Sequence, residues 1–97
     1  MKCHLRPEAR VELNDAALYY EDMREGLGDA FIEDFLLAVT EIEEAPSRWA
    51  ETEPGIRRFL LSRFPYKLIY RIGAEFIDIL AVAHSSREEG YWRDRMG

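Results

Sequence analysis

The sequence has a single cysteine, no long apolar run and none of the short motifs that mark a common cofactor or metal site. One cysteine, Cys3, excludes an internal disulfide and suits a reducing compartment. No apolar run approaches the roughly 20 residues that cross a bilayer, and the N-terminus, MKCHLRPEAR, lacks the apolar core of a secretion signal. We therefore expect a cytoplasmic protein that does not enter the membrane.

Motifs for several kinds of chemistry are also absent. The chain has no glycine-rich phosphate loop, no set of cysteine and histidine ligands, and no pair of carboxylates at a spacing typical of catalysis. We therefore expect neither a metal nor a cofactor.

The charge of the chain is negative overall but unevenly distributed. The net charge is −6; residues 1–50 carry 12 acidic and 5 basic side chains, whereas residues 51–97 carry 7 acidic and 8 basic ones. A protein that binds nucleic acid mainly through phosphates is expected to be basic. The total charge thus argues against broad nucleic-acid binding, but it is compatible with a local basic site in the second half.

The first half of the chain predicts a short strand followed by a helix. Residues 2–6 can form the strand, and Pro7 with Glu8 suits the first turn of the helix. Apolar residues then recur at helical spacing: Ala9, Leu13, Ala16, Ala17, Tyr20 and Leu27. Gly26 and Gly28 are expected to end this helix.

A second helix is expected to begin after Asp29, which can serve as its N-cap, and to end before Pro46. Its apolar stripe comprises Phe31, Phe35, Ala38, Val39 and Ile42. Because the loop between the helices is short, the two should form an antiparallel hairpin. We expect residues 45–54 to be a surface connection. The predicted core contains Phe31, Phe35, Val39 and Ile42, together with Leu13 and Ala17.

Three apolar-rich runs in the second half predict strands over residues 56–61, 66–72 and 76–83. Phe64-Pro65 and Gly73-Ala74 separate them, and both connections are too short for a crossover helix. The three strands are therefore expected to form an antiparallel meander. The predicted fold is α+β, a single domain of residues 1–97. In it, the helical hairpin packs on a mostly antiparallel four-stranded sheet, and a short C-terminal helix or tail follows.

The last of these strands predicts two apolar faces. Strict alternation places Ile77, Ile79, Ala81 and Ala83 on one face, and Phe76, Asp78, Leu80, Val82 and His84 on the other. Two helices that pack together cover only one face. The face with Leu80 and Val82 is then either a site for a partner or is covered by the C-terminal tail.

Basic and aromatic residues of the second half are the remaining candidates for a site. They are Arg57, Arg58, Arg63, Lys67, Tyr70, Arg71, His84, Arg87, Tyr91, Trp92, Arg93 and Arg95. Exposed arginine and lysine rarely need a special role, so this set is also compatible with solvated strand edges and an amphipathic terminal helix. His84 alone is more often a structural hydrogen-bonding group than a catalyst, and Tyr91 and Trp92 can anchor the tail by burying their rings.

The order and spacing of several segments resemble the RelE/ParE superfamily of bacterial toxins over essentially the whole chain. The segments are Arg57-Arg58, Phe64-Pro65-Tyr66, Leu68-Ile69-Tyr70-Arg71, Ile77 to His84, and then Arg87 and Trp92. The resemblance implies a small sheet with a helical hairpin packed on it. It also implies the toxin of a type II toxin–antitoxin, or plasmid stabilisation, module, neutralised by a cognate antitoxin.

RelE-like members of the superfamily are ribosome-dependent nucleases that cleave messenger RNA with basic residues and a tyrosine. Arg58, Lys67 and Tyr91 match the basic or tyrosine positions of that pattern. His84 and Arg87 lie near Tyr91 in the sequence and, as groups able to move protons or carry positive charge, could complete such a site.

Two departures favour the other branch of the superfamily. Leu60 stands where the nuclease pattern has a second lysine, and Ser85 stands where it has an arginine. Loss of two cations from a phosphoryl-transfer site removes much of its transition-state stabilisation. ParE-like members lack the nuclease set and inhibit DNA gyrase by protein–protein contact. The sequence therefore favours a ParE-like toxin that is not an enzyme, with the ribosome-dependent nuclease as the alternative.

The resemblance also implies two binding surfaces. The antitoxin's C-terminal segment is expected to wrap over the face made by Arg58, Tyr70, Arg71, Leu80, Val82 and Arg87. The tail residues Tyr91, Trp92, Arg93 and Arg95 are expected to contact the target, which is gyrase, or the ribosome with its message in the alternative. A third possibility is an interaction module of the same fold that is not toxic.

Overall fold

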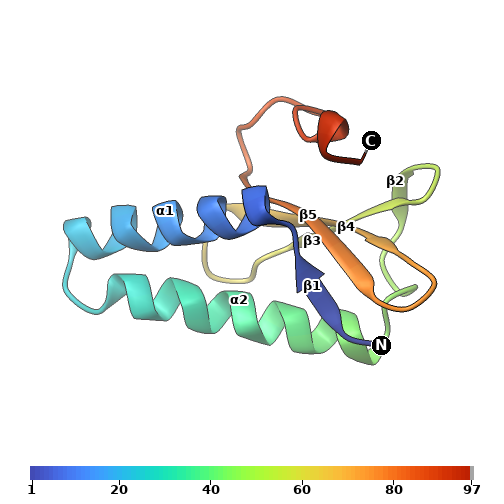
Figure 1. Ribbon diagram of the computed structural model, residues 1–97. Helices are drawn as coiled ribbons and strands as arrows, with labels where there is room; N and C mark the ends of the chain where they lie inside the picture. Colours follow the sequence, from blue (N-terminus) through green and yellow to red (C-terminus); the bar gives the residue numbers. More distant parts are fainter. Residues whose placement is uncertain (97) are drawn as a thin grey trace.

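The computed structural model describes residues 1–96, which form two layers: a pair of helices and a five-stranded sheet (Figure 1). The elements in chain order are β1 (Cys3–Leu5), α1 (Pro7–Met23), α2 (Leu27–Glu44), β2 (Glu51–Glu53), β3 (Ile56–Leu60), β4 (Tyr66–Ile72), β5 (Ile77–His84) and a 3-10 turn (Arg93–Met96). The strand order is β1-β5-β4-β3-β2. Only β1 and β5 run parallel within this sheet. The predicted α+β class is confirmed.

The sheet has one strand more than the sequence predicts. Residues 51–53 lie in the segment expected to be a surface connection, yet they pair with β3 as strand β2. The strand is short and lies at the edge of the sheet, where polar side chains can face water. Its sequence, Glu-Thr-Glu, therefore lacks the apolar residues from which a strand is predicted.

The predicted start of the second helix is wrong by three residues. Helix α2 begins at Leu27, its N-cap is Gly26 with φ +87°, and Gly28 lies inside it. Gly26 supplies the left-handed turn between the helices. At Gly28, a Cβ would lie 2.7 Å from the carbonyl oxygen of Ala17. The second glycine, Gly28, therefore allows the two helices to approach closely, and α2 begins before it.

The main core lies between the helices and one face of the sheet. Phe31, Phe35 and Ile42 of α2 and Leu13 of α1 are buried there, as predicted. They pack against the strand residues Leu68, Tyr70, Ile77, Ile79 and Val82. Ala17 and Val39 are only partly buried and pack at the margin of this core. The helical spacing of apolar residues thus identified the face of each helix that packs in the main core.

A β-bulge in β5 overturns the predicted alternation of that strand. Ile69 pairs with Ala81 but the next residue, Tyr70, pairs with Ile79, so Leu80 is an extra residue with no partner in β4. A bulge reverses the side-chain pattern beyond it. Val82 therefore joins the helix-facing core, whereas Leu80 belongs to a second cluster on the opposite face. The two residues do not share a face as expected.

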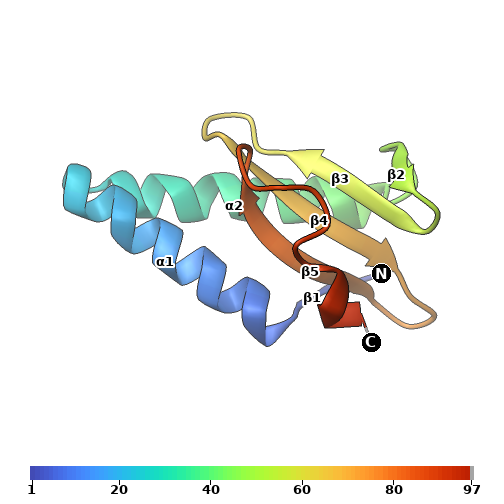
Figure 2. The same cartoon turned by 90° about the horizontal axis from the view of Figure 1, so that it is seen from above.

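The C-terminal tail, residues 85–96, covers that opposite face (Figure 2). Trp92, 2% exposed, packs with Leu80, Ala81, Ile56 and Ile69, and Met96 closes the edge of the cluster. The sequence left open whether the face that carries Leu80 is a partner site or is covered by the tail. The tail covers it, because burial of the Trp92 ring stabilises this arrangement. The sheet lies between two apolar layers of unequal size.

Candidate functional site

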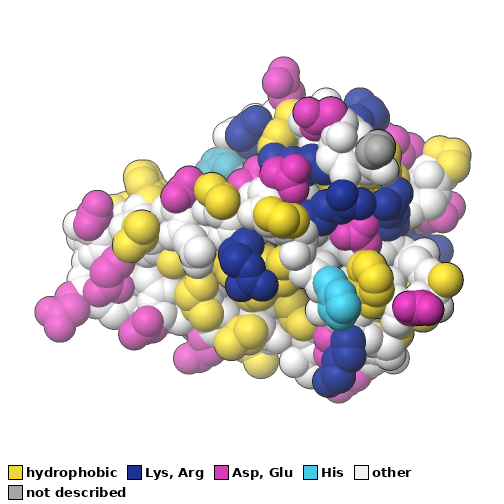
Figure 3. All heavy atoms as spheres, viewed as in Figure 1, with side chains coloured by type: hydrophobic (Ala, Val, Ile, Leu, Met, Phe, Trp, Pro, Cys, Tyr) yellow, Lys and Arg dark blue, Asp and Glu magenta, His cyan; other side chains and the backbone are white. Residues whose placement is uncertain are grey.

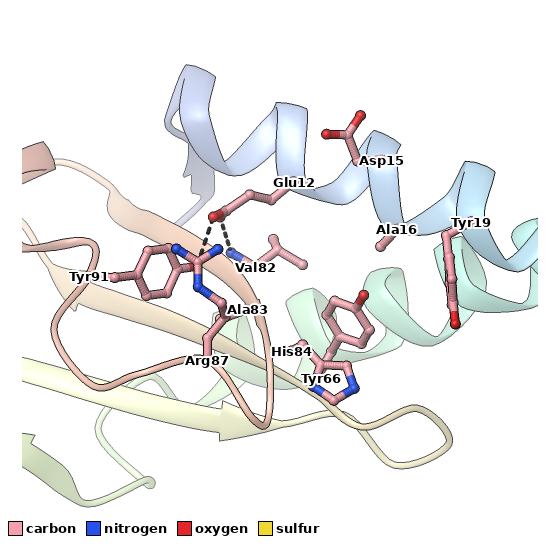
Figure 4. Close-up of a pocket in the computed structure, with 10 residues that line it drawn as sticks. All are labelled: Glu12, Asp15, Ala16, Tyr19, Tyr66, Val82, Ala83, His84, Arg87 and Tyr91. Carbon is pink, nitrogen blue, oxygen red and sulfur yellow. Dashed lines mark hydrogen bonds between the residues drawn. The ribbon is translucent and has the colours of Figure 1, made fainter.

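A groove of about 330 Å³ runs between α1 and the end of β5 (Figure 4). Helix α1 contributes Glu12, Asp15, Ala16 and Tyr19, the sheet contributes Tyr66, Val82, Ala83 and His84, and the tail contributes Arg87 and Tyr91. Three segments distant in the sequence therefore meet at one place, with carboxylate, imidazole, phenol and guanidinium groups around it.

Glu12 organises this groove. Its carboxylate accepts hydrogen bonds from the backbone N–H of Val82 at 3.0 Å and from the Tyr91 hydroxyl at 2.8 Å. Arg95 donates two further hydrogen bonds, both at 2.9 Å, in a bidentate pair. Arg95 also donates to the carbonyl oxygen of Leu80 at 2.9 Å. Helix α1, the bulge of β5 and the tail are thus joined through one side chain, by hydrogen bonds strengthened by charge.

Tyr91 is held in a state unsuited to acting as a base. Burial and the neighbouring Glu12 carboxylate raise the pKa of the Tyr91 hydroxyl well above its usual value. The guanidinium of Arg87 lies over its ring at 3.7 Å from the centroid, a cation–π contact. At neutral pH, the hydroxyl therefore stays protonated and donates a hydrogen bond to Glu12.

His84 lies at the outer end of the groove, where its ring meets the edge of the Tyr66 ring at 5.2 Å between centroids. The backbone N–H of Ser86 donates to Nδ1 of His84 at 3.0 Å, so Nδ1 is an acceptor. The Ser86 hydroxyl lies 2.8 Å from the same nitrogen. A neutral ring therefore carries its proton on Nε2, and the imidazole is oriented by its own turn.

The other two residues of the nuclease pattern lie outside this groove, on the tail side of the sheet. Arg58 of β3 and Lys67 of β4 both point at Glu89 of the tail, with nitrogens 3.5 and 3.2 Å from the same Oε1 oxygen. The predicted nuclease set is thus split into two groups: Arg58 with Lys67, and His84 with Arg87 and Tyr91. Each group contacts a carboxylate of the same chain: Arg58 and Lys67 contact Glu89, and Tyr91 contacts Glu12.

The surface separates charge as the sequence suggests. Acidic side chains cover the outer sides of the helices, whereas lysine and arginine gather where the sheet meets the tail (Figure 3). Asp78 of β5 receives hydrogen bonds from both Arg6 and Arg71. Within the part of the chain that the structure describes, no helix has the length and apolar character needed to cross a membrane.

Comparison with known proteins places the chain in a family. The model of the ParE toxin of the type II toxin–antitoxin system parDE matches residues 4–89. The chain belongs to the ParE toxin family. Among solved structures, it is similar to a chain from the chromosomal ParDE toxin–antitoxin system of P. aeruginosa, with 19% identity and a TM-score of 0.76. That match covers 87% of this chain and 95% of the other, and it supports the fold. No curated protein matches the sequence.

In this ParE family member, the residues expected to bind an antitoxin do not form one surface. Tyr70, Leu80 and Val82 are all at most 2% exposed. Tyr70 and Val82 face the helices, where the Tyr70 hydroxyl donates to the carbonyl oxygen of Pro46 at 2.6 Å. Arg58 and Arg71 retain accessible side chains on the tail side of the sheet, and Arg87 is exposed. The β5 bulge and the position of the tail account for this difference between the expected and observed surface. Neither can be predicted from the alternation of side chains along one strand.

The residues expected to contact a target are mostly engaged within the molecule. Trp92 fills the second cluster, while Tyr91 and Arg95 bind Glu12. Arg93 is the most accessible of the four and forms an ion pair with Glu53 of β2, with nitrogen and oxygen 2.6 Å apart. These contacts fix the path of the tail across the sheet.

Two important residues escaped the sequence analysis: Glu12 and Glu89. Glu12 has the same spacing as the solvent-facing acids of α1, and Glu89 lies among charged residues of the tail. No local signal distinguishes either one, because their partners lie up to 83 positions away in the sequence.

Replacing Glu12 with alanine should lower the free energy of unfolding by about 2 kcal/mol. The change removes the acceptor for three groups, while the partial exposure of Glu12 lets water replace some of the lost bonds. Urea unfolding monitored by circular dichroism measures this. Asp15→Ala, in the same groove but exposed, is the matched control and should change stability by under ~0.5 kcal/mol. Equal losses in both variants would contradict the role given to Glu12.

Cys3 should be chemically inert in the folded protein. Burial, followed by the charge of Glu43, raises the pKa of the Cys3 thiol to about 12. At pH 8, alkylation by iodoacetamide should therefore be slower than in the urea-unfolded chain by on the order of a hundredfold. The raised pKa contributes stability that is present below about pH 8.5 and is lost as the pH rises toward 12. Similar rates in the folded and unfolded states would contradict this assignment.

Proposed function

We propose that this protein is the toxin of a type II toxin–antitoxin pair that acts in the cytoplasm by binding DNA gyrase and is neutralised by a cognate antitoxin. The family match over residues 4–89 supports a toxin. The observation that carries the choice of mechanism is the division of the nuclease-pattern residues into two groups, with the Tyr91 hydroxyl bound to Glu12.

That arrangement disfavours cleavage of RNA. A nuclease of this kind needs a group to take the 2′-hydroxyl proton, cations on the phosphate and an acid for the leaving oxygen. Here the Tyr91 hydroxyl donates to Glu12, and Arg58 and Lys67 lie outside the groove that His84, Arg87 and Tyr91 line. Leu60, at a cation position of the nuclease pattern, is apolar and largely exposed. Inhibition by protein contact requires none of these catalytic groups.

For the antitoxin, we propose an extended path that includes the accessible arginines Arg58 and Arg71 on the tail side of the sheet and Arg87 beside the groove. Guanidinium groups offer bidentate contacts to carboxylates, so an acidic segment fits there. A segment that is disordered when free needs a large surface to offset the entropy of ordering, which favours a wrapped interface. The buried residues Tyr70, Leu80 and Val82 support this surface from within and do not contact the partner in this conformation.

For the target, we propose the outer side of the tail between Tyr91 and Arg95. Trp92 and Arg95 hold the tail on the sheet, and Arg93 presents a cation beside Glu53. A rigidly held segment loses little conformational entropy on binding, which favours inhibition by contact.

Induced expression in bacteria tests the proposed function. We expect growth arrest with abnormal nucleoids and with ribosome-bound messenger RNA intact, and we expect co-expression of the neighbouring antitoxin gene to restore growth. Site-specific cleavage of messages that is lost in Tyr91→Phe or Arg58→Ala would overturn the gyrase proposal in favour of the nuclease. Normal growth with normal nucleoids would point to a non-toxic interaction module.

A further inference from the structure

We propose that Arg58 and Lys67 form a carboxylate-binding site that Glu89 occupies in the free protein, and that an acidic side chain of a bound peptide segment replaces Glu89. This inference deepens the antitoxin-binding part of the proposed function and rests on that function for the identity of the natural partner. The occupant of the site in the structure, a glutamate carboxylate, shows the chemistry that the site accepts.

The geometry is that of a built site. Arg58 and Lys67 lie on adjacent strands and on the same face of the sheet, since Arg58 pairs with Ile69 and Lys67 with Leu60. Their nitrogens converge on a single oxygen, Oε1 of Glu89, at 3.5 and 3.2 Å. Two cations that meet at one oxygen form a pocket of positive potential, and this potential remains when the carboxylate departs.

Lys67 is the unusual member of the pair. Its side chain is only 6% exposed, although lysine is almost never fully buried unless it is paired. An apolar side chain at this position would avoid the cost of desolvating an ammonium group. The residue is therefore poorly explained by stability alone and well explained by recognition of an anion.

The Glu89 side chain can readily be displaced from Arg58 and Lys67. Its side chain is 63% exposed, and it lies in the connection between β5 and the Trp92 anchor, next to Gly90 with φ +80°. Ion pairs with an exposed partner contribute little because water and salt screen them. An incoming carboxylate that is held in place by further contacts can therefore displace Glu89.

The surroundings favour a peptide over a nucleic acid. Within residues 1–96, strand β2 pairs with β3 at Ile56 and Arg57 and at no further β3 residue, so the edge of β3 from Arg58 to Leu60 has no partner strand. A groove of about 460 Å³ lies along this edge, lined by Trp49, Ala50, Glu51, Thr52, Arg58 and Leu60. An extended segment can pair with a strand edge and place alternate side chains on the sheet face. The net charge of −6 opposes a polyanion such as RNA.

The test compares Glu89→Gln with Glu88→Gln, which makes the same change in charge at an exposed neighbour. The probe is a short synthetic peptide of alternating glutamate and threonine, and binding is measured by calorimetry at fixed salt. We expect Glu89→Gln to bind the peptide about fivefold more tightly than the wild type, or about 1 kcal/mol. Glu88→Gln should bind as the wild type does. The same peptide with glutamine in place of glutamate should show no gain.

Adding Lys67→Met to Glu89→Gln should abolish the gain. If circular dichroism shows that this double variant is unfolded, Arg58→Gln in the Glu89→Gln background is used instead, with the same expectation. Equal gains in Glu89→Gln and Glu88→Gln would overturn the proposal, because they would reflect net charge alone. A gain for single-stranded oligouridylate without a gain for the acidic peptide would overturn it in favour of a phosphate site. Because the probes are synthetic, failure here leaves the toxin assignment to be decided by the expression experiment.

Discussion

Replacing Trp92 with alanine should lower the free energy of unfolding by about 3–5 kcal/mol, the range measured for large aromatic residues in protein cores. Trp92 is 2% exposed and is the largest side chain in the cluster that covers the outer face of the sheet. Without it, Leu80 and Ile69 lose the ring that covers them, and the tail is held chiefly by polar contacts, such as those of Arg95 to Glu12, Arg93 to Glu53 and Glu89 to Lys67.

Urea unfolding gives this free energy, and limited proteolysis reports separately on the tail. We expect trypsin to cut Trp92→Ala at the tail arginines under conditions in which the wild type stays intact, because local release of the tail exposes them. Ser85→Ala is the matched control, since Ser85 is an exposed tail residue outside the cluster and its replacement keeps every tail arginine. A loss under ~1 kcal/mol for Trp92→Ala would mean that the tail is not part of the folded core.

Replacing Phe35 with alanine should have an effect of similar size, about 3–5 kcal/mol. Phe35 is 4% exposed and lies in the core between α2 and the sheet. The cavity that it leaves cannot collapse easily, because the helices are already in close contact at Gly28 and the strands are fixed by their ladder.

Leu36→Ala is the control for this change, because Leu36 is the next residue of α2 and is 56% exposed. It should alter stability by under ~0.5 kcal/mol. Thermal and urea unfolding of both variants measure the difference. Equal effects for the two variants would show that α2 does not present this face to the sheet.

The positions of most helices and strands follow from the sequence alone. Pro7 marks the start of α1, Pro46 follows the end of α2, and the break at Gly73 separates β4 from β5, as expected. The apolar spacing also identifies Phe31, Phe35 and Ile42 as core residues. These features depend on local backbone preferences and on periodicity within one element, which a single sequence records directly. The family resemblance likewise depends on the order of such segments, and the ParE match confirms it.

Only the tertiary structure decides which side chains meet. The bulge at Leu80 arises from the pairing of β5 with β4, and it moves Val82 to the helix-facing side, away from the face of Leu80 that it was expected to share. The tail returns over the sheet because Trp92 finds an apolar surface there. Glu12 and Glu89 gain their roles from partners on other elements. Such contacts depend on the register between strands and on chain reversals over long separations, and the alternation within one strand carries no information about either. The sequence therefore determined the elements and the family, whereas the packing of the bulged strand against the tail determined which charged groups are accessible to a partner.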